Sequence, residues 1–323
     1  MKTKVFGVLS LSVVLSIFRI YIIGNVIETD SGFYIRGNRL PDIFNILLVL
    51  AAVFCMTVLF NKKLKMSAAI SDIKSGWSVF SYISLGISFL ACGILYYFRF
   101  TSNVKVDSLE LFIMFLSFFA AILMIVASAA MNKKEKPFSI CYMILSPSIW
   151  FAICLISEFK GLTTIVAISE YLYEVLTICV IILFFYYFAR LFIGSKTYHK
   201  AAFYGLLSIM GIFVSVLPKF YYYILGTENV FITSFKPEYV VYAVCLIFIP
   251  VNLIVLSKRL TPEIVLVESD EESETEENSV EDEPRAVREP LNIEVEVNGE
   301  VTEEPQDTKV DEGKFEENKD DEN

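Results

Sequence analysis

The chain has 323 residues, of which 55% are hydrophobic and 15% are aromatic, and its mean hydropathy is +0.58. A soluble domain of this length is less apolar and carries more charge, so the composition excludes an ordinary soluble globular protein. The net charge of −10 averages two unlike parts, because residues 262–323 hold 25 of the 37 acidic residues and only 5 of the 27 basic ones. The rest of the chain is therefore basic, and the acidic end disfavours a nucleic-acid partner.

Eight apolar stretches follow one another along the first 256 positions. A stretch of about twenty residues matches the roughly 30 Å hydrocarbon core of a bilayer at about 1.5 Å of helix rise per residue. The runs are continuous and lack the alternation of barrel strands, so we expect helices. The sequence predicts an all-α, polytopic transmembrane bundle over residues 1–260, embedded in a lipid bilayer. The expected spans are Val5–Ile23, Ile43–Phe60, Ser78–Tyr97, Leu109–Met131, Phe138–Ser157, Tyr171–Ile193, Ala201–Ile224 and Tyr239–Leu256.

The first stretch follows Met1-Lys2-Thr3-Lys4 and has the general form of a signal peptide. Arg19 interrupts its apolar run, and no small-residue cleavage site of the Ala-x-Ala type follows. We therefore expect an uncleaved first span that also directs insertion.

Basic residues alternate between the gaps that separate the spans. One set of gaps and ends carries 14 Lys and Arg residues, whereas the other set carries seven. Because basic residues favour the cytoplasmic side, the richer set is predicted to be cytoplasmic, with both chain ends on that side.

Residues 261–323 are predicted to be a disordered, acidic cytoplasmic tail, because so charged a segment cannot bury enough apolar area to offset the entropy of ordering. Within the tail, Leu291–Val301 alternates apolar and acidic residues and reaches Asn298-Gly299, which is typical of a strand and turn. That segment is either disordered like its surroundings or adds as a strand to the sheet of a cytoplasmic protein partner.

Motifs that would indicate catalysis are absent from the sequence. The chain has a single histidine, His199, and no HExxH, GxSxG or phosphate-binding loop pattern. All six cysteines lie inside apolar stretches without a CxxC spacing, which favours packing roles over a disulfide or a metal cluster. We therefore expect no enzyme activity, no metal and no cofactor.

Charged residues inside or beside the spans are better candidates, because charge is expensive in lipid and marks ligand pathways or packing contacts. Arg19 lies about one turn from the outer end of the first span, and Glu174 lies at a similar depth in the sixth. The two either pair across the bundle around a polar outer-leaflet pocket or extend to the headgroups. Arg99, Glu110 and Trp150 complete the candidate ligand-binding set.

Other features on the predicted outer side of the membrane allow a structural interpretation as well as a functional one. Glu158 and Lys219 are rim charges of the kind found wherever helices meet water. The segment Glu28–Gly32 carries two acids and hydroxyls, which suit either a cation site or a hydrogen-bonded turn. Pro147 and Pro250 predict helix kinks, which are common in transporters and in membrane helices generally.

Three segments together resemble a group of uncharacterised multi-spanning, eight-helix membrane proteins of anaerobic Gram-positive bacteria. They are Ile27–Phe33, the motif Ser146–Trp150, and the sixth span from Tyr171 to Arg190. The resemblance covers residues 1–256 and implies a bacterial plasma membrane, but it implies no activity.

Two functions are expected from these patterns, and a membrane-embedded enzyme that acts on lipid or cell-wall precursors is a third alternative, disfavoured because acid–base pairs are lacking. The first is transporter-like handling of a small-molecule ligand in a polar outer-leaflet pocket. The second is a membrane anchor or sensor whose acidic tail recruits a cytoplasmic protein.

Overall fold

The computed structural model describes residues 1–28, 34–60, 76–102, 108–131, 139–162, 168–193, 195, 197–226 and 236–257, with the backbone alone for residues 161–162 and 168–170. The predicted acidic tail, most of the segment Glu28–Gly32 and most of the basic loops lie outside these residues.

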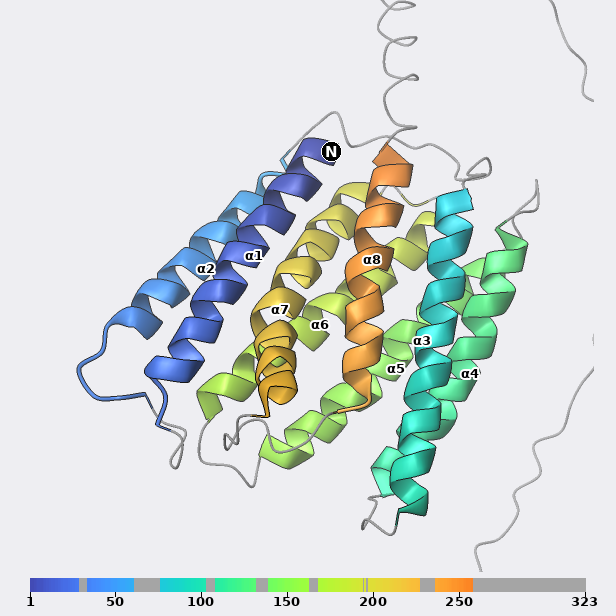
Figure 1. Cartoon of the computed structure of the whole chain (residues 1–323). Helices are drawn as coiled ribbons and strands as arrows, with labels where there is room; N and C mark the ends of the chain where they lie inside the picture. Colours follow the sequence, from blue (N-terminus) through green and yellow to red (C-terminus); the bar gives the residue numbers. More distant parts are fainter. Residues whose placement is uncertain are drawn as a thin grey trace, which may run out of the picture. The chain divides into compact units, whose positions relative to one another are not determined.

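Eight α-helices and no β-strand occur in the described ranges, so the predicted all-α class is confirmed (Figure 1). The helices are α1 (Lys2–Asn25), α2 (Leu40–Met56), α3 (Gly76–Thr101), α4 (Ser108–Ala130), α5 (Ser139–Leu162), α6 (Ile168–Leu191), α7 (Tyr198–Leu225) and α8 (Glu238–Ser257). Seven of them are long and apolar enough to cross a membrane. The prediction of eight spans therefore holds only in part, because α2 is a shorter apolar helix of 17 residues.

Helix α2 also begins earlier than predicted. Pro41 sits in its first turn, where the absent N–H has no intrahelical partner to lose and the fixed φ suits a helix start. At the other end the chain leaves the helix after Met56 and turns, so the predicted continuation to Phe60 is not helical. At about 1.5 Å per residue, α2 is about 26 Å long, a little less than the hydrocarbon thickness.

Six helices form a closed ring in which α3 contacts α4, α4 contacts α5, and so on through α8, which returns to α3. Outside the ring, α1 packs mainly on α7, and α2 packs on α1 and α7 (Figure 1). Successive helices run in opposite directions. The N-terminus and the end of α8 accordingly lie at the same end of the bundle.

Aromatic side chains fill the ring, so it encloses a packed core. Phe151 stacks on Phe185, and Phe185 stacks on Phe248 with ring centroids 5.6 Å apart. Tyr82 meets Phe248 edge to face, and Trp150 meets Phe89 in the same way. A separate small cluster of buried apolar residues, including Leu15, Phe44 and Met210, joins α1, α2 and α7.

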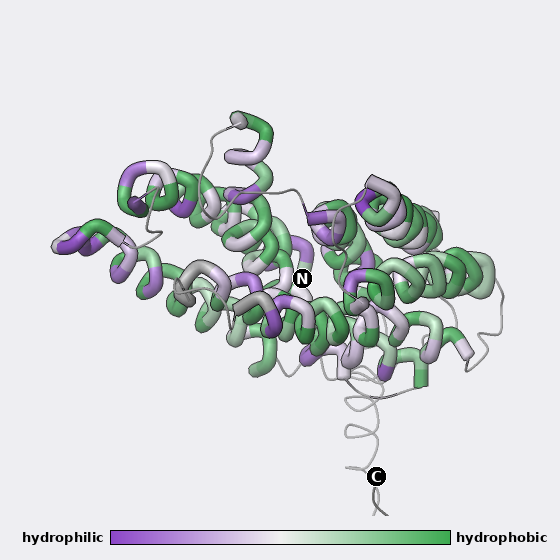
Figure 2. Tube along the Cα trace, turned by 90° about the horizontal axis from the view of Figure 1, so that it is seen from below, coloured by the Kyte–Doolittle hydropathy of each residue, from purple (hydrophilic) through white to green (hydrophobic). Residues whose placement is uncertain are grey.

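The outward faces of the helices are apolar as well. On α4, the side chains at intervals of three and four residues are more than half exposed, namely Phe112, Phe115, Phe119 and Ile122. A water-facing helix would place polar residues there, whereas lipid favours this pattern. Figure 2 shows hydrophobic residues predominating along the helices.

Prolines lie inside α5, α7 and α8, and polar contacts are described beside the first and the last of them. Pro147 cannot donate to the carbonyl of Met143 four residues earlier, and the Ser146 hydroxyl donates to that oxygen instead, at 2.8 Å. Near Pro250, Asn252 donates to Ser81 at 3.0 Å and accepts from Ser78 at 2.9 Å, which ties α8 to α3. The contact at Pro147 supports the structural reading of that proline.

Candidate functional site

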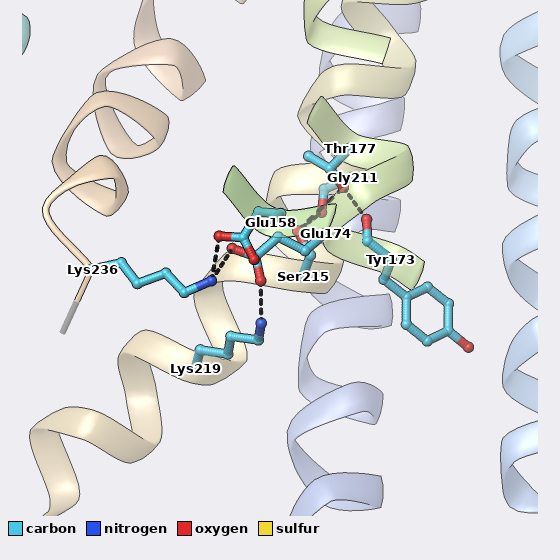
Figure 3. A network of polar contacts seen from close by, with 8 residues as sticks. All are labelled: Glu158, Tyr173, Glu174, Thr177, Gly211, Ser215, Lys219 and Lys236. Carbon is cyan, nitrogen blue, oxygen red and sulfur yellow. Dashed lines mark hydrogen bonds and ion pairs between the residues drawn. The ribbon is translucent and has the colours of Figure 1, made fainter. Parts of the chain in front are cut away.

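Glu174 is the centre of a group of buried charges at one end of the bundle (Figure 3). It lies in the second turn of α6, and its side chain is 3% exposed. Its Oε2 accepts a hydrogen bond from Lys219 Nζ of α7, and its Oε1 accepts one from Lys236 Nζ at 3.3 Å. The same Lys236 ammonium binds Glu158 Oε1 of α5 at 2.5 Å.

These four residues, Glu158, Glu174, Lys219 and Lys236, form what we call the charged cluster. They come from α5, α6, α7 and the segment that leads into α8, so four separate parts of the chain meet there. Their side chains are between 3% and 28% exposed, and two positive charges offset two negative ones. Such a set can bind ionic groups of either sign or hold its four segments together.

Burial and the neighbouring carboxylates act in opposite directions on the pKa of Lys236, which precedes α8. Burial by itself would lower the pKa of its ammonium, because the charged form loses hydration. The carboxylates of Glu174 and Glu158 more than offset that effect and raise the pKa well above its ordinary value. Lys236 therefore stays protonated throughout the physiological pH range.

Two hydroxyl groups, those of Thr177 and Ser215, lie next to the cluster at the contact between α6 and α7 (Figure 3). Thr177 Oγ1 lies 3.2 Å from Ser215 Oγ, and each hydroxyl also donates to a carbonyl of its own helix. The helices approach closely here because Gly211 faces Thr177. A Cβ atom at Gly211 would lie 2.7 Å from Thr177 Oγ1.

Arg19 is buried beside this region, with only 1% of its surface exposed. Its guanidinium lies over the rings of Tyr173 and Phe44, at 4.4 and 5.2 Å from their centroids, and it donates to the Tyr34 hydroxyl at 3.2 Å. The sequence predicts either that Arg19 pairs with Glu174 or that both extend to the headgroups, whereas the ion pairs found at Glu174 are with Lys219 and Lys236. Arg19 contacts the residue immediately before Glu174, so the two predicted residues are neighbours in space.

The other predicted site residues lie elsewhere. Arg99, in the last turn of α3, forms a 3.6 Å ion pair with Glu110 at the start of α4, and both side chains are partly exposed. Trp150 is fully buried, and its Nε1 donates to Ser117 Oγ at 2.7 Å. Its rings also contact the core residues Phe89 and Phe151, which is the environment of a packing residue.

Sequence reasoning gave Lys236 and Glu238 no role in the site. Glu238 is the first residue of α8 and is 9% exposed. The Tyr96 hydroxyl of α3 donates to its Oε1, while no described residue is hydrogen-bonded to its Oε2. The available signal was the position of Glu158, Glu174, Lys219 and Glu238, each near a span end on the same predicted side of the membrane.

A groove of about 240 Å³ lies between α2, α6 and α7. Its walls are almost entirely apolar, and Tyr173 and Thr177 border it. Val49 and Leu176, which also line it, are 61% and 51% exposed, so the groove lies on the outward, lipid-facing side of the helices.

Within the described residues, no three His, Cys, Asp or Glu side chains are grouped so that they could hold a metal ion. Comparisons of the chain with protein-family models, with curated proteins and with solved structures gave no match.

Proposed function

We propose that this chain is a transporter-like membrane protein whose charged cluster is the ligand-binding centre of a polar pocket. The observation that carries the proposal is the meeting of Glu158, Glu174, Lys219 and Lys236 inside a largely apolar bundle. Charged side chains inside a membrane bundle tend to mark pathways for ions, protons or polar solutes.

The physical argument rests on the cost of burying charge. Removing two carboxylates and two ammonium groups from water costs several kcal/mol per ion, and well-packed apolar residues would join the same helices at least as well. A bundle that needed only mechanical stability would gain little from this arrangement. Retention of four charges is therefore better explained by a ligand that exchanges with one of the ion pairs.

The chemistry of the cluster favours a small solute that carries charge. An anionic group would replace Glu174 at Lys219 or Lys236, and a cationic group would be accepted by the released carboxylate. A zwitterionic solute would satisfy both partners at once. Arg19, held by the rings of Tyr173 and Phe44, would orient the α6 segment that carries Glu174.

The proposed setting is a bacterial plasma membrane with all eight helices spanning it and both termini in the cytoplasm. The bias of Lys and Arg residues, 14 against seven, supports this orientation. Under this orientation the charged cluster faces the outer leaflet, because it lies at the end of the bundle opposite the N-terminus.

The test uses the full chain in detergent and in liposomes, with a panel of zwitterionic amino acids, small carboxylic acids and small amines as probes. We expect at least one class to raise the thermal unfolding temperature and to enter liposomes that contain the wild-type protein. Both effects should be lost in Glu174→Gln and Arg19→Leu.

Matched controls are Asp42→Asn and Arg190→Leu, which make equivalent changes at exposed positions. Both controls should retain the response of the wild type. The same response in all five proteins, or no response to any probe in the wild type, would contradict the proposal.

A second function is favoured by the tail, whose residues 262–323 carry 25 acidic and 5 basic residues. In that case the bundle is an anchor or sensor, and the tail binds a cytoplasmic protein with a basic surface. A full-length chain and one truncated after residue 261 would be used as baits at low salt. Capture of the same proteins by both would count against this function.

A further inference from the structure

Another buried ionisable group lies beside the charged cluster, at the first residue of α8. Glu238 is nine-tenths buried, and the two oxygens of its carboxyl group differ in their hydrogen bonding. Oε1 accepts a hydrogen bond from the Tyr96 hydroxyl of α3, whereas Oε2 is buried and has no hydrogen-bond partner among the described residues. A carboxylate prefers donors at both oxygens, so this arrangement does not suit the ionised form.

The balance of charge around Glu238 leads to the same conclusion. In the charged cluster, Lys219 and Lys236 already offset Glu158 and Glu174. Among the described residues, a negative charge on Glu238 would have no cation of its own, because both lysines already bind other carboxylates, and it would add to the negative charges of Glu158 and Glu174. An uncompensated buried carboxylate is so costly that such a group takes up a proton instead.

The titratable groups around Glu238 do not change this balance. The groups that interact with it electrostatically are Tyr96 and Cys92 of α3, Cys154 and Glu158 of α5, and Lys236, Tyr239 and Tyr242 in or next to α8. Glu174 of α6 and Lys219 of α7 complete the charged cluster beside them. The lysines are the cations of this set, and both bind other carboxylates. The phenols and thiols are neutral at physiological pH, so they supply no positive charge.

We propose that Glu238 is a proton-binding site that is occupied at neutral pH. The bound proton sits on Oε2, and the Tyr96 hydroxyl orients the group through Oε1. Release gives a carboxylate and a free proton, and Lys236, two residues earlier, is the cation that can move from Glu158 to neutralise it. Coupling of this proton to solute binding rests on the proposed transporter-like function, whereas proton occupancy does not.

A metal cation fits the position less well than a proton. Sodium, magnesium and calcium need several oxygen ligands, and Glu238 offers one oxygen without a hydrogen-bond partner. The Tyr96 oxygen already directs its hydrogen towards Glu238. The proton needs only the one oxygen.

The first test is infrared spectroscopy of the full-length protein in liposomes at neutral pH. We expect the carbonyl stretch of a protonated carboxyl group, shifted in deuterium oxide and lost in Glu238→Gln. The band should remain in Glu158→Gln and in Asp42→Asn, and it should change frequency in Tyr96→Phe, which removes the hydroxyl but keeps the ring. A spectrum with no protonated carboxyl band, or a band that survives unchanged in Glu238→Gln, would overturn the proposal.

A second test compares two identical substitutions by thermal unfolding at neutral pH. Glu238→Gln replaces a neutral acid by a neutral amide of the same shape, so the midpoint should be unchanged, whereas Glu174→Gln should lower it. Equal losses in the two variants would show that Glu238 is ionised. Stabilisation of the wild type but not Glu238→Gln by sodium chloride, with no effect of potassium chloride, would assign the site to sodium instead.

These outcomes separate the proton site from the proposed function. A Glu238 band in a protein that responds to no solute would retain the proton site and reject the transporter-like function. A solute response that persists in Glu174→Gln, together with the Glu238 band, would move the ligand site away from the charged cluster while leaving Glu238 protonated.

Discussion

Lys219 of α7 and Glu174 of α6 form a direct ion pair inside the bundle, with their side chains 9% and 3% exposed. The two residues are 45 positions apart in the chain. Glu174 also binds Lys236, which reaches on to Glu158, so this pair links α6 and α7 to α5 and to the start of α8. A substitution at Glu174 should therefore remove an ion pair from both Lys219 and Lys236.

Glu174→Gln should destabilise the protein by roughly 3–5 kcal/mol, because it leaves buried ammonium groups without their shared carboxylate. Unfolding of the purified protein in mixed micelles would measure this loss. The double variant Glu174→Gln, Lys219→Met should lose less than the sum of the two single variants, since it removes both members of the pair. If the losses of the two single variants add exactly in the double variant, the ion pair contributes nothing to the stability of the folded state.

The raised pKa of Lys236 predicts a loss of stability at alkaline pH. Its stabilising contribution is fully present below the ordinary lysine value of about 10.5 and is lost as the pH rises towards the higher folded-state value. The difference in unfolding free energy between the wild type and Lys236→Met should be constant near neutrality and should shrink above about pH 10.5. A difference that grows with pH would mean that folding does not raise the pKa of Lys236.

Gly211→Ala should separate α6 from α7, because its Cβ would lie 2.7 Å from Thr177 Oγ1 and 3.1 Å from Thr177 Cγ2. Overpacking of this kind costs about 1–3 kcal/mol. Gly7→Ala is the matched control, since nothing lies within 4 Å of a Cβ atom at that position. Thermal unfolding should give a lower midpoint for the first variant only, because Ala is the better helix former at both positions and only Gly211 faces a close neighbour. A loss of similar size in both would show that the contact with Thr177 is not the cause.

Trp150→Phe should remove the hydrogen bond from Nε1 to Ser117 Oγ, which is 2.7 Å long and fully buried. Together with Ser117→Ala and the double variant it forms a thermodynamic cycle. The coupling energy should be about 1 kcal/mol, the usual size for a hydrogen bond between membrane helices. A coupling near zero would show that Trp150 acts through its volume alone.

Local patterns predicted the helices well but not their contacts. The apolar runs located all eight helices. Both ends of α2 were displaced, the start by Pro41 and the end by a turn after Met56, and α5 continues beyond the predicted Ser157 to Leu162. Glu174 was identified from its depth in an apolar run. Its partner was not, because Lys219 and Arg19 both lie near the ends of predicted spans, and depth alone does not distinguish them.

The tertiary structure also gave several residues roles that the sequence did not predict. Trp150 was predicted as a ligand-binding residue, whereas it is a hydrogen-bonded core residue. Tyr96, to which the sequence assigned no site role, donates a hydrogen bond to Glu238. Lys236 looked like a loop cation, and it proved to be the residue that joins two carboxylates. Each role depends on what a distant helix places opposite the side chain.

The amino-acid sequence by itself determined the all-α class, the positions of the helices and the separation of a basic bundle from an acidic end. These are local properties, because lipid requires each helix to satisfy its own backbone and to reach a set length. Only the tertiary structure decided that Glu174 meets Lys219 and Lys236, and that Glu238 stands apart with Tyr96. Those contacts depend on the rotation and neighbours of each helix, which are set by close packing between segments far apart in the chain.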